Sequence, residues 1–399
     1  MLVVLVYFIR GTVLPWYVHV PDSAWVLLIV AALFAGAGMA VAGGGTWRLS
    51  WVIVLLAFAA SLSKAEQFYV AGSRWVGLAL MILAVGPVIV NPGAVEARAA
   101  AWRLMVTGMT TLTAIFVVWY VLRLPSFGAG DFSSFMNQCM LVAPISGIGV
   151  VIALARALHG RSWRWGVLAV AGLVPMVAAG SRVAVLATGA AVCFLLVRRK
   201  PALGGVFALL FLGLVGGFFL LHGTDDTSDE SAGGLVRKGT VNTRADLWQS
   251  RMEEFESSPV LGIGVAMGTG SGSAVEASGA IRVEPGSSYL AILAMTGALG
   301  ALSFSIALGL LLYGFASARQ KPSLDRDILS VVGVFLAVHG IAEGWVLAFG
   351  SPLACIFWLW LGNVGDAARQ PARAIAKRRV SAPPRFARPI GPTPTAPSC

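Results

Sequence analysis

The chain has 399 residues, of which 57% are hydrophobic and only 12% are charged, and its formal net charge is +11. With a mean hydropathy of +0.82, this composition excludes an ordinary soluble domain and is typical of an integral membrane protein. The basic excess is not evidence for nucleic-acid binding, because basic cytoplasmic loops and attraction of a basic tail to anionic lipid account for it.

Apolar segments of about 20 residues, the length with which a helix crosses a bilayer, recur along the chain. The expected fold class is therefore an all-α polytopic membrane protein with about twelve transmembrane helices, of which the third and the last are short. In chain order, the expected segments are 2–20, 23–43, 49–63, 75–91, 103–122, 135–155, 164–180, 182–197, 202–221, 288–316, 328–348 and 351–364.

The longest polar stretch, residues 223–286, separates the ninth segment from the tenth. The sequence thus predicts transmembrane helices in 1–222, a large loop with a short amphipathic helix in 223–286, and further transmembrane helices in 287–365. Residues 366–399 are basic and then Pro-rich, and we expect them to form a disordered tail.

Lys and Arg are concentrated in the tail and in the loops on one side of the predicted bundle, for example in residues 198–200 and 319–326. Because such loops usually face the cytoplasm, we expect both termini to be cytoplasmic and the 223–286 loop to lie outside. The four cysteines give no disulfide framework and no zinc spacing. The first apolar run lacks the basic start of a cleavable signal peptide and carries Arg10 in its middle.

Basic residues are few on the outer side, so each is a candidate for binding an anion. Lys64, Glu66 and Arg74 are expected in the loop after the third segment, where they either form an ion pair or line a cleft.

Arg182 follows Ser181 and opens the eighth segment, whose N-terminus points outward. Free backbone N–H groups, the positive end of the helix dipole and a guanidinium meet there, which predicts an anion site. Alternatively, Arg182 anchors the helix at the membrane interface.

Within the large loop, residues Asn242–Gly264 predict an amphipathic helix that is capped by Thr243 and stopped by Pro259. At about 100° per residue, one face carries the apolar side chains and the opposite face carries acids. The apolar face is Leu247, Trp248, Met252 and Phe255, and the acidic face is Asp246, Glu253 and Glu256.

Arg244 and Arg251 fall on the apolar face, about 10 Å apart along the helix axis. The pattern therefore turns two guanidinium groups toward the bundle, and such groups bind phosphate oxygens well. Alternatively, both arginines reach past the apolar surface to water, or pair with Glu254 and the acids of the loop.

His339 and Glu343 lie in the eleventh segment at positions i and i+4, which places them on one face of a helix. Because that segment runs outward, we expect Glu343 near the outer surface and His339 about 6 Å deeper. Ionisable side chains inside a membrane often do chemistry, and a carboxylate can orient a histidine that takes or gives a proton. A hydrogen-bonded structural pair is the alternative, and Glu284, just before the tenth segment, is the other candidate carboxylate.

The order of these elements resembles the O-antigen ligase and O-antigen polymerase superfamily, bacterial membrane proteins that transfer glycans. Gly180-Ser181-Arg182 resembles the Ser-Arg motif of that superfamily. The loop pattern is similar as well, with Arg244, Leu247-Trp248, Phe255, Ser258-Pro259 and Gly262-Ile263-Gly264 in order. Residues Ser287–Gly300 resemble the ligase motif of His-Asn/Ser, nine residues and Gly-x-x-Gly, but Gly286 stands at the histidine position, where the usual general base would be.

This resemblance implies a GT-C-like fold and a metal-independent, inverting glycosyltransferase in the bacterial inner membrane, with no cofactor and with its active site on the periplasmic face. The donor would be a glycan on undecaprenyl diphosphate, and the acceptor would be lipid A-core for a ligase or another glycan for a polymerase. Without a metal ion, Arg182, Arg244, Arg251, Lys64 and Arg74 would bind the diphosphate. The catalytic candidates are His339, Glu343 and Glu284.

We expect a ligase of lipopolysaccharide biosynthesis, because the spacing of Gly297 and Gly300 matches the ligase motif. A polymerase of O-antigen or exopolysaccharide repeats uses the same donor and is the alternative. A polyprenyl-glycan flippase or another transporter is a third reading, although the sequence shows no repeated halves of the kind common in transporters. A non-catalytic assembly partner is a fourth, because the motif histidine is missing.

Overall fold

The computed structural model describes residues 2–10, 12, 22–125, 132–136, 139–160, 162–222, 240–265, 273–275, 281–283, 286–318 and 323–369. Glu284 and nearly all of the expected tail therefore lie outside the described residues. The backbone of Arg244 is described, whereas its side chain is not.

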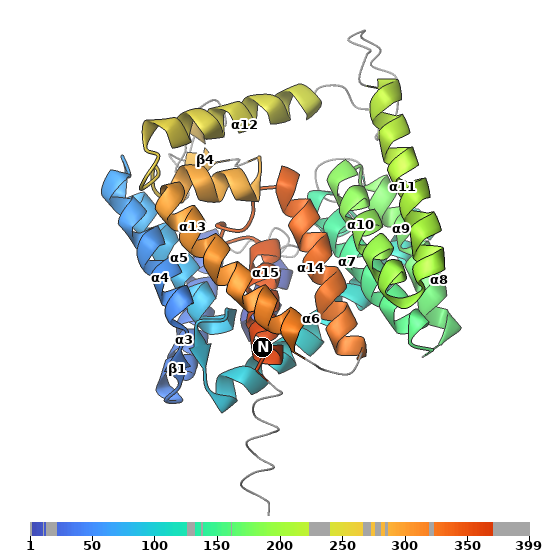
Figure 1. Ribbon diagram of the computed structural model, residues 1–399, viewed down its shortest axis with the longest axis horizontal. Helices are drawn as coiled ribbons and strands as arrows, with labels where there is room; N and C mark the ends of the chain where they lie inside the picture. The colour runs from blue at the N-terminus through green and yellow to red at the C-terminus, as the bar shows by residue number, and fades with distance from the viewer. Residues whose placement is uncertain are drawn as a thin grey trace, which may run out of the picture.

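The described chain is mainly helical (Figure 1). Its helices are α1 (Leu2–Arg10), α3 (Asp22–Ala42), α4 (Leu49–Ala60), η1 (Ser61–Lys64), α5 (Phe68–Val85), α6 (Pro92–Val121), α7 (Cys139–Leu158), α8 (Trp163–Ala171), α9 (Leu173–Ala178), α10 (Arg182–Arg199), α11 (Pro201–His222), α12 (Thr240–Ser257), α13 (Ser288–Ser317), α14 (Leu324–Ala342) and α15 (Pro352–Ala367). Two short antiparallel pairs join β1 (Thr46–Trp47) to β2 (Ile89–Val90) and β3 (Ser273–Val275) to β4 (Ile281–Val283).

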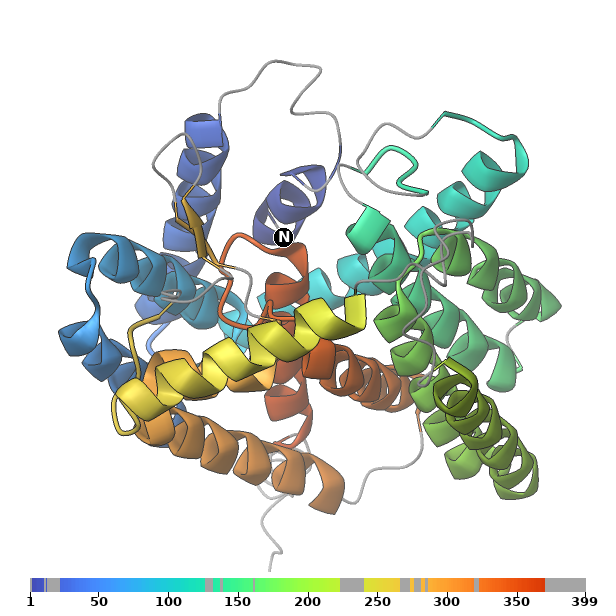
Figure 2. The same ribbon diagram turned by 90° about the horizontal axis from the view of Figure 1, so that it is seen from above.

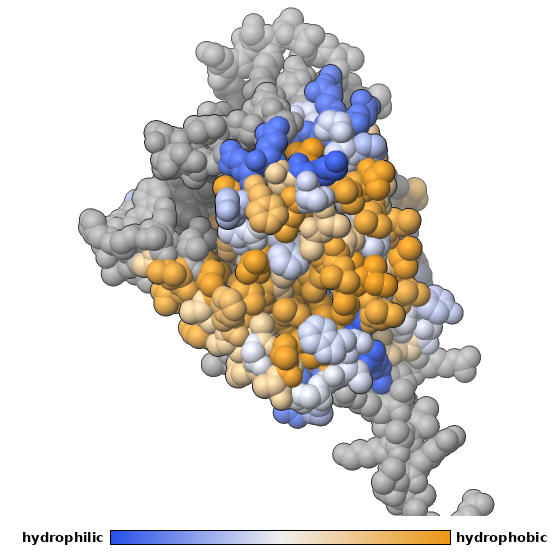
Figure 3. All heavy atoms as spheres, turned by 90° about the vertical axis from the view of Figure 1, so that its left-hand side faces the viewer, coloured by the Kyte–Doolittle hydropathy of each residue, from blue (hydrophilic) through white to orange (hydrophobic). Residues whose placement is uncertain are grey.

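The described helices confirm an all-α membrane protein. Four of them, α5, α6, α7 from Leu141 and α13, are long and apolar enough to cross a membrane. Figure 3 shows a hydrophobic band across one side of the molecule, with hydrophilic residues above and below it. Such a band is typical of a surface that faces lipid. The number of about twelve spans stays a prediction.

Helix α15 lies at the centre of the bundle, and every residue from Leu353 to Asp366 is buried. Its aromatic side chains pack against other helices: the Trp358 ring lies 5.8 Å from that of Trp51 in α4 and 6.1 Å from that of Phe304 in α13. Helix α12 lies across one end of this bundle, over α13 (Figures 1 and 2). The loop region therefore rests on the transmembrane part instead of standing apart from it.

A buried ion pair ties α6 to α15. The Arg98 side chain donates from Nε to Asp366 Oδ2 at 2.8 Å and from Nη2 to Asp366 Oδ1 at 2.9 Å. Arg98 is only 2% exposed, so the Asp366 carboxylate must compensate its charge. The same carboxylate also contacts Arg48 Nη2, at 3.4 Å. The expected start of a disordered tail at residue 366 is too early, because α15 continues through Asp366 to Ala367.

Two other expected boundaries are wrong, and both affect candidate residues. Helix α5 begins at Phe68 instead of residue 75, so Arg74 lies within a helix and not in a loop. Helix α14 ends at Ala342 instead of residue 348, and Glu343 has an extended backbone with φ −134° and ψ 128°. His339 and Glu343 are therefore not an i, i+4 pair on one helix.

Candidate active site

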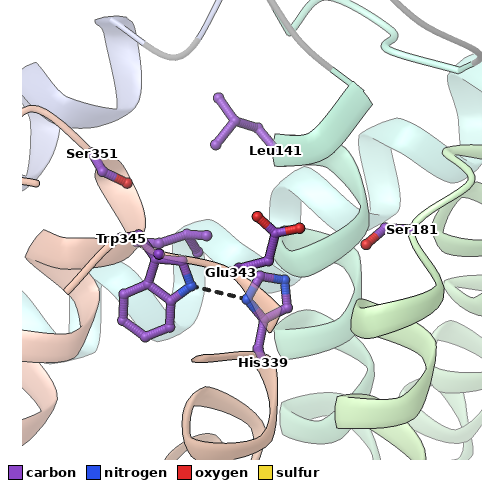
Figure 4. Close-up of a pocket in the computed structure, with 8 residues that line it drawn as sticks. Leu141, Ser181, His339, Glu343, Trp345 and Ser351 are labelled. Atoms are coloured by element: carbon purple, nitrogen blue, oxygen red, sulfur yellow. Dashed lines mark hydrogen bonds between the residues drawn. The ribbon is translucent and has the colours of Figure 1, made fainter. Parts of the chain in front are cut away.

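A cavity of about 140 Å³ opens where several helix ends meet. Its lining comes from α7, the residue before α10, the last turn of α14, the segment between α14 and α15, and the start of α15 (Figure 4). The lining residues are Leu141, Ser181, His339, Glu343, Gly344, Trp345, Ser351 and Leu353. His339 and Glu343 thus meet in one site, although the helix expected to join them ends between them.

Ser288 holds the segment that carries Glu343. Its hydroxyl donates to the Glu343 carbonyl at 2.7 Å and accepts from the backbone N–H groups of Trp345 at 3.1 Å and Val346 at 3.4 Å. These bonds replace the helical ones that the backbone would otherwise make, which explains why α14 stops early. Ser287 is the N-cap of α13, and its side chain makes no cap hydrogen bond.

His339 is buried in the last turn of α14 and is 2% exposed. Its ring stacks on Phe335 with 5.5 Å between centroids and an interplanar angle of 17°. The indole Nε1 of Trp345 donates to His339 Nδ1 at 3.0 Å. Figure 4 shows the Glu343 carboxylate reaching into the space between His339 and Leu141.

Arg182 is the first residue of α10, as expected, and Ser181 is its N-cap. The Ser181 hydroxyl accepts from the Ala184 N–H at 3.3 Å and also lines the cavity. The N-terminus of α10 is therefore directed at the cavity that contains His339 and Glu343. A helix N-terminus attracts negative charge, so this end of the cavity suits an anion.

Helix α12 turns Arg251 inward, as expected, but its buried face is rotated from the predicted one. Ser250, Arg251 and Glu254 are buried, whereas Trp248 is 37% exposed and Met252 is 39% exposed. Arg251 Nη1 lies 2.6 Å from Glu254 Oε2. Burial lowers the pKa of the Arg251 guanidinium, and the Glu254 carboxylate opposes this shift. Pairing with Glu254 was the alternative interpretation, and the structure shows this ion pair between two buried residues of α12.

The loop after α12 docks onto a break in α13. Gly297 has φ +64° and ψ −174°, so two helical hydrogen bonds of α13 cannot form there. The groups that the break exposes bond to the loop instead. The carbonyls of Ala294 and Met295 accept from Ile263 and Gly264, and the N–H groups of Ala298 and Leu299 donate to Pro259 and Val260, at 2.8–3.1 Å. The loop that carries the Gly-Ile-Gly motif therefore packs against the Gly-x-x-Gly motif of α13.

Gly286, at the motif's histidine position, has φ +66°. A Cβ atom there would lie 3.0 Å from Leu247 Cβ, and the Gly286 carbonyl accepts from Trp248 Nε1 at 3.2 Å. A histidine would have to adopt the left-handed conformation, which costs an L residue about 1–2 kcal/mol, and its Cβ would crowd Leu247 of α12. This position joins α12 to the start of α13.

The structure does not bring all the predicted residues together. Arg182, Arg251, Lys64 and Arg74 are not among the described residues that line the cavity. Lys64 is exposed at the end of η1, and Arg74 is half-buried in α5. Conversely, no sequence pattern indicates a role for Trp345, because its hydrogen bond to His339 depends on the turn that follows α14. Among the described residues, no cluster of three His, Cys, Asp or Glu side chains could hold a metal ion, and metal independence stays a prediction.

Comparison with known proteins agrees with the motifs. Residues 167–305 match the sequence profile of the family described as O-antigen ligase. This segment runs from α8 to the middle of α13, so it includes Arg182, α12 and the break at Gly297, but neither His339 nor Glu343. A search of curated proteins found no match to the chain. The match over residues 167–305 supports the resemblance of this chain to the O-antigen ligase and O-antigen polymerase superfamily.

Proposed function

We propose that this protein is a glycosyltransferase that moves a glycan from undecaprenyl diphosphate to an acceptor hydroxyl at the periplasmic face of the bacterial inner membrane. The observation that supports it best is the cavity that joins the N-terminus of α10 to His339 and Glu343. An anion site beside groups that can handle a proton is what transfer from a lipid-linked diphosphate requires.

Arg182 and the N-terminus of α10 would hold the diphosphate. Each charge-assisted hydrogen bond to the leaving group is worth about 1.5–3 kcal/mol. Arg244 would add a second guanidinium from α12. Arg251 has a different role in this proposal, because it is buried and paired with Glu254 within α12. Lys64, exposed at the end of η1, and Arg74, half-buried in α5, would act only on the outer approach to the site.

In the transfer step, the oxygen of the acceptor hydroxyl attacks the anomeric carbon of the donor sugar. The bond from that carbon to the phosphate oxygen breaks, and the diphosphate leaves with the electron pair. The hydroxyl proton passes to a base in the cavity, for which Glu343 and His339 are the described candidates. Direct attack inverts the anomeric centre, and the scheme needs no metal ion because guanidinium and backbone N–H groups take up the leaving charge.

Lipid A-core is the acceptor that we propose, which makes the protein a ligase of lipopolysaccharide biosynthesis. The support is the ligase spacing of Gly297 and Gly300, of which Gly297 forms the break in α13. A second donor glycan is the alternative acceptor, as in a polymerase, because the donor chemistry would be the same.

The test is transfer by the purified protein in liposomes that contain the undecaprenyl-diphosphate glycan and either lipid A-core or a second donor glycan. We expect product with lipid A-core, and the same rate after addition of a chelator. Product only with the second glycan would identify a polymerase. No product, together with movement of the donor across the bilayer, would identify a transporter and overturn the proposal.

Arg182→Ala should lower transfer about 10- to 150-fold, the equivalent of one charge-assisted hydrogen bond. Arg182→Lys should lose less, because it keeps the charge without the fork of donors. Arg164→Ala is the matched control, since Arg164 is an exposed arginine in the first turn of α8 and is expected at the opposite face. Full activity of Arg182→Ala would remove Arg182 from the diphosphate site.

A further inference from the structure

The two ring nitrogens of His339 are chemically distinct because of Trp345. An indole N–H can only donate a hydrogen bond, and Trp345 Nε1 lies 3.0 Å from His339 Nδ1. Nδ1 must therefore offer its lone pair. In the neutral imidazole, the proton is then on Nε2.

Trp345 is held firmly enough to impose this choice. It is 5% exposed, its ring packs edge-on against Phe357 with 5.6 Å between centroids, and its backbone N–H donates to the Ser288 hydroxyl at 3.1 Å. Its backbone and its side chain are thus fixed by different neighbours. A donor held in this way stays in place when substrate binds, as preorganised sites require.

A proton acceptor needs a free lone pair, and His339 has none in this arrangement. Nδ1 is occupied by Trp345, Nε2 carries the proton, and one face of the ring is covered by Phe335. A second proton on Nδ1 would face the indole N–H directly. With Nδ1 bound to Trp345, Nε2 of the neutral ring is an N–H donor, whereas the carboxylate of Glu343 accepts hydrogen bonds only.

We propose that Trp345 is a positioning residue that fixes His339 with its proton on Nε2, so that His339 donates a hydrogen bond in the cavity and Glu343 is the base. This assignment rests on the proposed transferase function. In the transfer step, the proton of the acceptor hydroxyl moves to the Glu343 carboxylate, and His339 keeps its own proton throughout.

The first test measures the position of the proton directly and needs no activity. The chain has only four histidines, so ¹⁵N-histidine labelling gives few imidazole signals, and His339→Gln identifies the one from His339. We expect a protonated Nε2 and an unprotonated Nδ1. Trp345→Phe should change these two signals, whereas Trp360→Phe should not. Trp360 is the matched control because its buried Nε1 donates to a backbone carbonyl, that of Leu329, at 2.7 Å. A proton on Nδ1 in the native protein would overturn the assignment.

The second test separates donor from base by activity. The side-chain amide of His339→Gln can donate in place of Nε2 but cannot take up a proton, so this variant should lose only about 2- to 10-fold in kcat. Glu343→Gln should lose about 10²- to 10⁴-fold, the usual effect of removing a general base. Trp345→Phe should lower kcat with KM unchanged, and Trp360→Phe should match the native rate.

The outcomes separate this inference from the proposed function. If His339→Gln loses about 10²- to 10⁴-fold in kcat and Glu343→Gln stays active, His339 is the base. The inference is then wrong, although the proposed transferase function stands. If the native protein transfers no glycan in any assay, the proposed function fails, and the NMR experiment still decides the position of the proton. Circular dichroism and gel filtration of each variant exclude misfolding as the cause of a loss.

Discussion

The contact between the loop at 258–264 and the break in α13 can be tested with two glycine substitutions. A Cβ atom on Gly262 would lie 2.4 Å from the backbone of Met295, and one on Gly297 would lie 2.3 Å from the Val260 carbonyl oxygen. Both neighbours are backbone atoms that cannot rotate away. Gly262→Ala and Gly297→Ala should therefore each release the loop, because each glycine is the only residue small enough for its half of the contact.

The magnitude follows from the bonds that the loop makes. Four backbone hydrogen bonds join it to α13, and at about 0.5–1.5 kcal/mol each they stabilise the docked loop by about 2–6 kcal/mol. Keeping the loop docked would instead require an alanine in the left-handed conformation, at a cost of about 1–2 kcal/mol plus the collision. We expect the free energy of local opening to fall by about 2 kcal/mol or more, which is about a 30-fold faster amide exchange.

Hydrogen exchange of the amides of Ile263, Gly264, Ala298 and Leu299 measures this change. Because both substitutions break the same contact, the double variant should exchange hardly faster than either single one. Gly309→Ala is the control, since Gly309 lies in the same helix with no atom within 4 Å of its added Cβ, and it should stabilise α13 by about 0.5–1 kcal/mol. Amide exchange as slow as in the native protein in both single variants would refute the shared contact. An increase in the double variant equal to the sum of the two single effects would refute it as well.

Three further substitutions follow from buried charges and from the missing histidine. Glu254→Gln leaves Arg251 buried without its counter-ion and should destabilise the docking of α12 by about 3–5 kcal/mol, measured by hydrogen exchange of α12; unchanged exchange would contradict the ion pair. Asp366→Asn should cost about 3–5 kcal/mol in thermal unfolding because Arg98 loses its partner, whereas Asp325→Asn, on an exposed residue, should stay within about 0.5 kcal/mol. Gly286→His restores the motif's histidine but should lower transfer and stability, with a cost of at least about 1–2 kcal/mol; a gain in activity would show that the position can serve as the base.

Local chemistry could be read from the sequence, and contacts between distant residues could not. Ser181 was expected to open a helix at Arg182, and it does, because an N-cap depends only on residues three positions away. The predicted end of α14 is wrong because Ser288, distant in sequence, makes hydrogen bonds to the backbone around Glu343. These bonds replace the helical ones.

The face of α12 shows a second limit. Apolar periodicity predicted that Trp248 and Met252 would be buried, but the acid beside Arg251 lets the charged pair occupy the interior instead. A pattern of single residues cannot show that two charges neutralise each other. Trp345 is a third case, since a tryptophan in a turn acquires its role only when the fold places its N–H 3.0 Å from His339.

The central claim is that the cavity beside the N-terminus of α10 receives the lipid-linked diphosphate and the reacting sugar. The most direct measurement is photo-crosslinking with an undecaprenyl-diphosphate glycan that carries a photoreactive group on the donor sugar, followed by mapping of the labelled peptides. We predict labels in residues 181–185 and 343–345, lost on competition with the unlabelled donor and reduced in Arg182→Ala. Labels confined to other parts of the chain, with these two segments unmodified, would contradict the account.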